Sequence, residues 1–222
     1  IIAFVAEFSR GKSELINAIF FGDYGNRILP STAGRTTMCP TELLFEAGKP
    51  PAIELLPIET RSTNASVAEF KRFPEEWRVV ELDTASAEAM HAALSRVGEQ
   101  KLVSQELAAK LGFAIDAEGK AGLKPDAGGL VEIPCWRHAV INFPHPLLEQ
   151  GLVILDTPGL NAIGAEPELT LSQLPNAHAI LFILAADTGV TQSDLAVWRD
   201  HVNGARTRQK GRIAVLNKID GL

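Results

Sequence analysis

The stretch AEFSRGKSEL, residues 6–15, decides the fold of this chain. Its first eight residues differ from the phosphate-binding pattern, GxxxxGK followed by Ser or Thr, only at Ala6, where the pattern has glycine. The residues IIAFVAEF at 1–8 form an apolar run that predicts a buried strand, and KSELINAIFFG at 12–22 predicts a helix. Backbone N–H groups that open onto a helix N-terminus bind anions. The stretch therefore predicts a phosphate site between a strand and a helix.

The residues of this loop have distinct predicted roles. Gly11 lets the backbone approach a phosphate closely, Lys12 reaches the β- and γ-phosphates of a nucleotide, and the Ser13 hydroxyl binds Mg²⁺. Ala6 is compatible with the loop if its φ is negative, because a methyl group is excluded only from left-handed backbone.

Two further segments supply candidate groups for the metal and the γ-phosphate. DTPG at 156–159 follows the predicted strand GLVIL, which would place Asp156 near Mg²⁺ through a water molecule and the Gly159 N–H near the γ-phosphate. Thr37 lies between the phosphate loop and the next predicted strand. It can bring a hydroxyl to Mg²⁺ and a backbone N–H to the γ-phosphate.

A fourth segment predicts recognition of the base. NKID at 217–220 follows the predicted strand RIAVL. The Asp220 carboxylate can accept two hydrogen bonds from the N1 and N2 edge of guanine, a pairing that adenine cannot make. In open α/β sheets, ligands bind at the carboxyl ends of the strands. We therefore expect Asn217, Lys218 and Asp220 to bind a guanine nucleotide beside the phosphate loop.

Apolar strands that alternate with helices indicate a doubly wound α/β fold with a mostly parallel sheet and helices on both faces. Further strands are expected at 41–46, 52–59, 138–144, 151–155, 179–187 and 212–216, and a helix at 191–204 with Thr191 as its N-cap. Helical patterns predict a helical insertion at 62–130 inside one domain that covers residues 1–222. The chain starts within an apolar run and ends just after NKID, so we expect a domain truncated at both ends.

Composition narrows the class of protein. Hydrophobic residues make up 46% and charged residues 22% of the chain, as in ordinary globular proteins. The net charge of −6 does not indicate direct nucleic-acid binding or general attraction to acidic membranes. Cys39 and Cys135 lack metal-binding spacing and predict reduced thiols. We expect a cytoplasmic protein.

These motifs together resemble the dynamin superfamily of GTPases, and specifically its bacterial dynamin-like branch. AEFSRGKSELINAIF resembles the phosphate loop of that branch, LPSTAGRTTMCPTEL its first switch, and VILDTPGLN and LNKID its remaining nucleotide motifs. The first-switch alignment assigns the switch threonine to Thr37, with Thr36 as the competing position. Residues 135–171 resemble proteobacterial members linked to chromosome partitioning and sister replication fork colocalisation. The resemblance implies a P-loop NTPase fold, GTP and GDP as ligands, and Mg²⁺.

The chain departs from its relatives where they orient the attacking water. Leu160 follows DTPG where small GTPases carry a catalytic glutamine, and Phe8 occupies the position of the phosphate-loop glutamine of eukaryotic dynamins. Ser9 matches the family serine that helps to hold a monovalent cation, K⁺ or Na⁺. Arg10 and Arg35 are each either an arginine finger or a solvated loop charge. The resemblance also implies that two GTPase domains pair across their nucleotide faces, as a homodimer or a larger assembly.

The candidate residues form three sets. The catalytic set is Lys12, Thr37, Ser9 and Gly159; the nucleotide-binding set is Ala6, Phe8, Ser9, Arg10, Gly11, Lys12, Ser13, Asn217, Lys218 and Asp220; the metal set is Ser13, Thr37 and Asp156.

Two functions remain open. The first is a Mg²⁺-dependent GTPase whose activity rises on dimerisation. The second is a GTP-gated assembly module with negligible turnover that docks to a replication or membrane partner.

Overall fold

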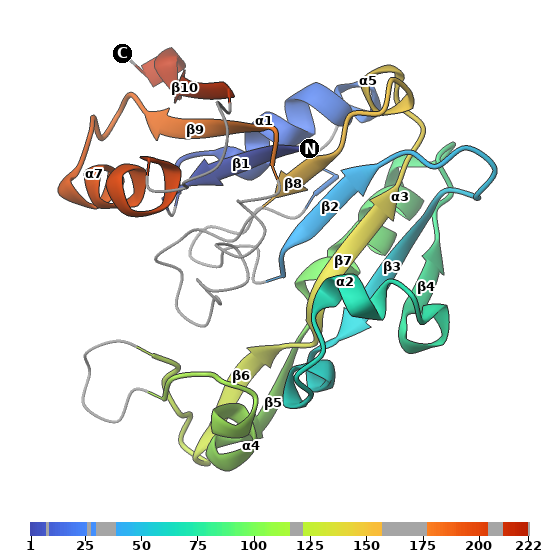
Figure 1. Cartoon of the computed structure of the whole chain (residues 1–222), viewed down its shortest axis with the longest axis vertical. Helices are drawn as coiled ribbons and strands as arrows, with labels where there is room; N and C mark the ends of the chain where they lie inside the picture. Colours follow the sequence, from blue (N-terminus) through green and yellow to red (C-terminus); the bar gives the residue numbers. More distant parts are fainter. Residues whose placement is uncertain are drawn as a thin grey trace.

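A large mixed sheet runs through the molecule (Figure 1). The computed structural model describes residues 1–7, 9–25, 28–29, 39–115, 122–156, 177–203 and 211–221. Across these residues the sheet has the strand order β10-β9-β1-β8-β2-β7-β3-β4. Its strands are β1 (Ile2–Ala6), β2 (Thr41–Leu44), β3 (Ala52–Pro57), β4 (Arg78–Glu81), β7 (Trp136–Asn142), β8 (Ile154–Asp156), β9 (Ala179–Ala185) and β10 (Gly211–Asn217). Two further strands, β5 (Gln100–Ser104) and β6 (Leu130–Pro134), form a separate antiparallel pair.

The helices are short, as expected for connections in an α/β domain. They are α1 (Lys12–Phe20), α2 (Val67–Phe70), α3 (Ala87–Ser95), α4 (Gln105–Lys110), α5 (Pro146–Glu149) and α7 (Gln192–Val197), which continues as the π-helical segment η6 (Trp198–Asn203). Single 3₁₀ turns occupy Gly22–Tyr24 (η1), Ile58–Ser62 (η2), Pro74–Glu76 (η3), Arg96–Gly98 (η4) and Ile219–Gly221 (η7). Thr191 is the N-cap of α7, as predicted.

The α/β fold is confirmed, but the sheet is mixed: beyond the parallel strands on one side of it, β2 and β7 are the one further parallel pair among the described strands. β10, β9, β1 and β8 are mutually parallel, whereas β2 is antiparallel to β8, and β3 is antiparallel to both β7 and β4. The turn at residues 45–51 explains part of the difference. It joins β2 to β3 and is too short for the crossover of a dozen or more residues that parallel strands need, so the chain must reverse.

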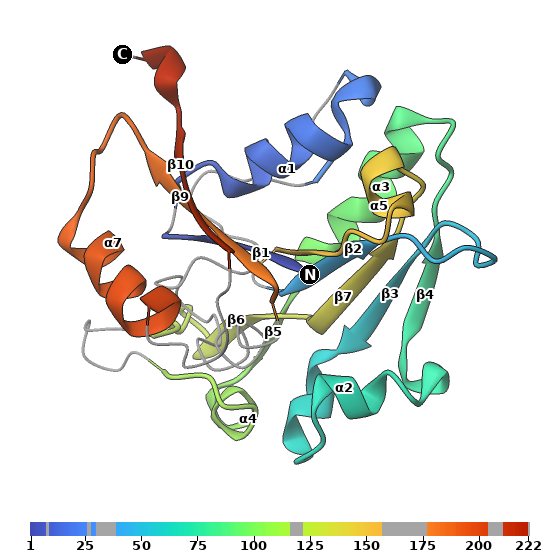
Figure 2. The same ribbon diagram turned by 45° about the horizontal axis from the view of Figure 1, so that its top comes forward.

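Helices cover both faces of the sheet, and the alternation of side chains along β1 shows why (Figure 2). Phe4 and Ala6 belong to the hydrophobic cluster that also contains residues of α1, α3 and α5. Ala3 and Val5 point to the other face, into a cluster that includes Val197 of α7. Successive side chains of a strand project to opposite faces, so one apolar strand supplies two cores.

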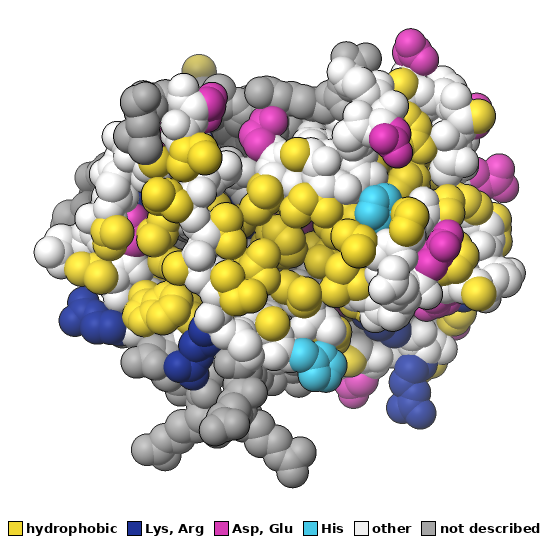
Figure 3. Space-filling view, turned by 90° about the horizontal axis from the view of Figure 1, so that it is seen from above, with side chains coloured by type: hydrophobic (Ala, Val, Ile, Leu, Met, Phe, Trp, Pro, Cys, Tyr) yellow, Lys and Arg dark blue, Asp and Glu magenta, His cyan; other side chains and the backbone are white. Residues whose placement is uncertain are grey.

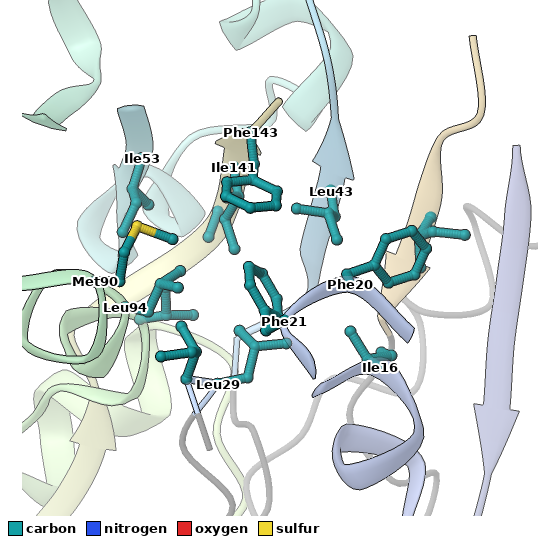
Figure 4. Packing of buried hydrophobic residues seen from close by; sticks show 14 of the residues in the cluster. Ile16, Phe20, Phe21, Leu29, Leu43, Ile53, Met90, Leu94, Ile141 and Phe143 are labelled. Carbon is teal, nitrogen blue, oxygen red and sulfur yellow. The ribbon is translucent and has the colours of Figure 1, made fainter. Parts of the chain in front are cut away.

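The larger core lies under α1 and α3 (Figure 4). Phe21, which is 1% exposed, packs against Phe143 with ring centroids 5.1 Å apart. Met90 and Leu94 of α3 are fully buried in this core, as their helical spacing predicts. Ile19 of α1 is 38% exposed, because the side chains of this helix that point toward the core are Ile16, Asn17 and Phe20.

The segment 62–130 contains strands as well as the expected helices. β4 extends the main sheet next to β3, while β5 pairs with β6 and packs with α4 over a small cluster of buried residues. This pair lies at the far end of the molecule from β10 in Figure 1. Its status as an insertion within the domain stays a prediction.

One face of the molecule is apolar (Figure 3). Figure 3 views the molecule from above Figure 1, where α1, α5 and the edge strand β10 lie. Large exposed hydrophobic side chains on these elements are Ile19, Leu147, Ile213 and Leu216. In the described part of the chain, no helix combines the length and apolarity needed to cross a membrane.

Candidate nucleotide-binding site

The phosphate loop has left-handed backbone on both sides of Arg10. It follows β1 and leads into α1, with Ser9 at φ 62° and Gly11, the N-cap of α1, at φ 79°. Ala6 is not in left-handed backbone: it ends β1, is fully buried, and points its methyl group into the core under α1. The replacement of glycine at position 6 therefore adds a core contact without strain, as the sequence predicted.

The loop that follows β10 lies directly on the phosphate loop. The Asn217 amide Nδ2 donates hydrogen bonds to the carbonyl oxygens of Arg10 at 3.1 Å and Gly11 at 3.2 Å. A Cβ on residue 11 would stand 2.4 Å from Nδ2 of Asn217, which is too close for any side chain. Gly11 is thus required for this contact as well as for its positive φ.

Lys12 and Asp156 form a buried ion pair at the carboxyl ends of β1 and β8. Lys12 Nζ donates to Oδ1 of Asp156, and both residues are only 6% exposed. Asp156 stands opposite Thr41 of β2 in the sheet. Ser13 follows Lys12 in the first turn of α1. The pair brings the predicted phosphate-binding cation and the predicted metal-associated carboxylate into contact, because β1 and β8 are neighbouring parallel strands.

The side chain of Arg10 lies inside the protein, 6% exposed. Its guanidinium donates to Glu7 Oε2 at 2.8 Å, Asp194 Oδ2 at 2.9 Å, Thr191 Oγ1 at 3.3 Å and the Thr188 hydroxyl. The interpretation of Arg10 as a solvated loop charge is therefore wrong: burial is compensated by two carboxylates, one of them from the first turn of α7.

The remaining base-recognition residues follow β10. Lys218 has φ 56°, donates from Nζ to Asp187 Oδ2 at 3.1 Å, and brings its Cε within 4.0 Å of the Cβ position of Gly11. Asp220 lies in η7 and is exposed. The structure thus places Asn217 and Lys218 against the phosphate loop and Asp220 at the surface of the adjacent turn.

The structure describes most of the predicted site residues. Ala6, Ser9, Arg10, Gly11, Lys12, Ser13, Asp156, Asn217, Lys218 and Asp220 are among them. Phe8, Thr36, Thr37, Arg35, Gly159 and Leu160 lie outside the described residues, and their roles stay predictions.

Sequence reasoning missed Asn17, a buried amide in α1. Its Oδ1 accepts from the backbone N–H groups of Ile28 at 3.0 Å and Leu29 at 2.7 Å, and its Nδ2 donates to the carbonyl of Leu29 at 3.0 Å. Asn17 therefore holds the chain that leads from α1 toward the predicted first switch. A polar residue beside Ile16 on the buried face of an amphipathic helix was the available signal.

A second missed cluster lies away from the phosphate loop, between β2, β7 and α2. Burial alone would raise the pKa of Glu42. Hydrogen bonds and positive charge from His138 at 3.0 Å and Lys71 at 2.7 Å outweigh it and lower this pKa to about 2. His138 is fully buried on β7.

Burial also raises the pKa of the Cys39 thiol, and both cysteines, Cys39 and Cys135, are free thiols, as expected.

Comparison with known proteins decides the family. The model of the Dynamin family matches residues 2–219. The chain belongs to the dynamin family. A bacterial dynamin-like protein of Nostoc punctiforme is 37% identical to it over 67 residues, which are 30% of this chain and 10% of that protein.

Solved dynamin structures share the fold. Two chains from an oligomerised bacterial dynamin pair, described as providing a mechanism for long-range sensing and tethering of membranes, align with 100% and 99% of this chain. Their identities are 21% and 17%, and their TM-scores 0.48 and 0.50. This chain spans 10% of the curated relative and 26% and 28% of the solved chains. The family match over residues 2–219 confirms the dynamin GTPase fold; the narrower resemblance to proteins of chromosome partitioning stays a prediction.

Proposed function

We propose that this dynamin-family chain binds GTP and GDP in the crevice between the phosphate loop, the end of β8 and the loop after β10. The main observation in support is the contact of Asn217 with the carbonyl groups of Arg10 and Gly11. It joins the segment that would recognise guanine to the loop that would hold the phosphates, although the two are more than 200 residues apart. Lys12 then neutralises phosphate charge from within the same crevice.

The oxygen donors of the crevice suit Mg²⁺, which prefers hydroxyl, carboxylate and water ligands. Ser13 and Asp156 would hold the ion together with Thr37, which lies outside the described residues. The Lys12–Asp156 ion pair supports this assignment, since it brings the carboxylate to the residue that precedes Ser13. Such an ion would supply positive charge that offsets the negative charge developing in phosphoryl transfer.

We further propose that the site hydrolyses GTP and that two domains pair across it. Phosphoryl transfer needs positioning and charge neutralisation more than covalent chemistry by the protein. Backbone groups near Thr37 and Gly159 would hold the attacking water. Ser9 is exposed on the phosphate loop and is available to a monovalent cation, whereas Arg10 is buried within its own domain. An oligomerised pair among the structural relatives is consistent with pairing.

Nucleotide titration tests the proposal. Calorimetry of the protein with Mg²⁺ should show binding of GTP and GDP, with ATP much weaker, and Lys12→Ala should abolish it. Equal affinities for ATP and GTP would contradict guanine recognition. Lack of binding of any nucleotide would contradict the site itself.

Steady-state turnover separates the enzyme from a GTP-gated assembly module. Specific activity that rises with protein concentration supports an enzyme activated by pairing, and tight binding with negligible turnover at every concentration supports the module. The structural relatives named for membrane tethering favour a membrane as the docking partner of such a module in the cytoplasm.

A further inference from the structure

The Arg10 guanidinium donates to four acceptors, and three of them lie outside the phosphate loop. These three are on Thr188 after β9, and on Thr191 and Asp194 at the start of α7. Asp194 is 184 residues from Arg10 in sequence and 1% exposed. The arrangement connects the phosphate loop to an element on the other face of the sheet from α1.

The network depends on the guanidinium because two carboxylates converge on it. Glu7 Oε2 and Asp194 Oδ2 lie 2.8 and 2.9 Å from the same nitrogen, Nη2 of Arg10. The Thr191 hydroxyl also bridges them, at 3.2 Å from Glu7 and 2.8 Å from Asp194. Without the cation, two carboxylates would face each other in a region that excludes water, where like charges repel strongly.

The backbone around Arg10 needs such support. Ser9, a non-glycine residue, is at φ 62°, and Gly11 is at φ 79°. Left-handed backbone is unfavourable for a residue with a side chain and persists only where its surroundings hold it. A side chain anchored between these two residues restricts both, so the N–H groups of the loop keep one direction.

We propose that Arg10 is a positioning residue: its guanidinium locks the phosphate loop to the N-terminus of α7, and nucleotide affinity depends on this lock although Arg10 touches no phosphate through its side chain. The inference rests on the proposed GTP site. It assigns the same role to Asp194, and it separates Arg10 from an arginine finger, which would act on the transition state rather than on affinity.

Two conservative variants and their combination test the lock. Arg10→Lys keeps the positive charge but loses the fork that reaches four acceptors, and Asp194→Asn removes the carboxylate on α7. Each should raise the Kd of GTP and the Kd of GDP by at least about tenfold, the loss expected for about one hydrogen bond between the loop and a charged phosphate. The two Kd values should rise by the same factor, because the loop N–H groups bind phosphates that both nucleotides carry. The double variant should be no weaker than the poorer single variant, because both remove one interaction.

The matched control is Arg96→Lys, which changes an arginine paired with Glu99 at the surface and should leave both Kd values unchanged. Thermal melting of every variant establishes that it is folded at the assay temperature. Thr188→Val removes the acceptor for Arg10, together with a long hydrogen bond to the Ala185 carbonyl, without changing charge, and should raise the Kd about threefold. It provides the answer if Arg10→Lys or Asp194→Asn fails to fold.

These measurements distinguish failure of the Arg10 proposal from failure of the proposed GTP site. If the unaltered protein binds neither nucleotide, the GTP site itself is wrong. If it binds and Arg10→Lys keeps the original Kd but loses about 10³-fold in kcat, Arg10 is a finger and the lock is overturned. Unchanged Kd in Asp194→Asn, or strictly additive losses in the double variant, would also overturn it.

Discussion

The amide of Asn217 occupies the space that a side chain on residue 11 would need. Its Nδ2 lies 2.4 Å from the Cβ position of Gly11 and donates to the carbonyls of Arg10 and Gly11. The end of β10 and the loop after β1 are thereby joined through the Asn217 side chain, which packs directly on the backbone of the loop.

Gly11→Ala should therefore weaken GTP binding by at least about tenfold, since the methyl group must displace Asn217 as well as adopt left-handed backbone. Gly48→Ala is the matched control: its φ is 88°, but nothing lies within 4 Å of its Cβ position. It should cost about 1 kcal/mol of stability and leave the Kd of GTP unchanged. Equal Kd values for the two variants would contradict the role of the Asn217 contact.

Lys12→Met should lower the free energy of unfolding of the nucleotide-free protein by about 3–5 kcal/mol, because it leaves Asp156 buried without its cation. Lys49→Met removes a comparable ion pair with Glu46 at the surface, where 57% and 48% of the two side chains are exposed. That change should stay within about 1 kcal/mol. Urea unfolding measures both, and similar losses would show that burial of the pair does not matter.

Asp220→Asn should exchange guanine preference for xanthine. The amide offers a donor where guanine also has donors, so GTP affinity should fall by about 10²-fold through loss of two charge-assisted hydrogen bonds, while xanthosine triphosphate should bind more tightly than GTP. Asp23→Asn, in the exposed turn η1, is the control for loss of one negative charge. Competition against a labelled GDP analogue gives both affinities. Unaltered base preference would remove Asp220 from the base site.

Ser9→Ala should reduce turnover by about 10²-fold while the Kd of GTP is retained, because the cation that we assign to Ser9 acts on charge developing in the transition state. In the unaltered protein, specific activity should rise with protein concentration and require K⁺ or Na⁺. Ser95→Ala, at the exposed C-terminal end of α3, should behave like the unaltered protein. Turnover of Ser9→Ala equal to that of the unaltered protein would reject this assignment.

Glu42 should make stability depend on acid pH. Burial opposes its ionisation, but His138 and Lys71 lower its pKa in the folded protein to about 2, from about 4.5 when unfolded. A lowered pKa contributes stability above the unfolded value, and that contribution is lost as the pH falls from about 4.5 toward 2. Its size is about 3 kcal/mol. Urea unfolding of Glu42→Gln should show a weaker pH dependence in this range; an equal slope would exclude the linkage.

Sequence reasoning predicted that the candidate residues at the ends of the apolar strands lie near one another, and their placement agrees. Asp156 and Asn217 are the last residues of β8 and β10, and Lys12 begins α1 after the loop that follows β1; parallel strands bring their carboxyl ends to one edge. The strand order and directions in the mixed half of the sheet were harder to predict, since β7 inserts between β2 and β3 from about 90 residues further along the chain. Strand pairing of this kind leaves no local pattern in the residues that pair.

Local patterns by themselves determined the phosphate loop, its strand and helix, the N-cap at Thr191 and the order of the nucleotide motifs, because glycine conformation, capping and hydrophobic periodicity act over a few neighbouring residues. Only the tertiary structure decided the direction and burial of Arg10, the contact of Asn217 with the backbone at Gly11, and the lowered pKa of Glu42. Each of these depends on partners brought in from distant segments, and charge and burial at a residue are set by what surrounds it in space.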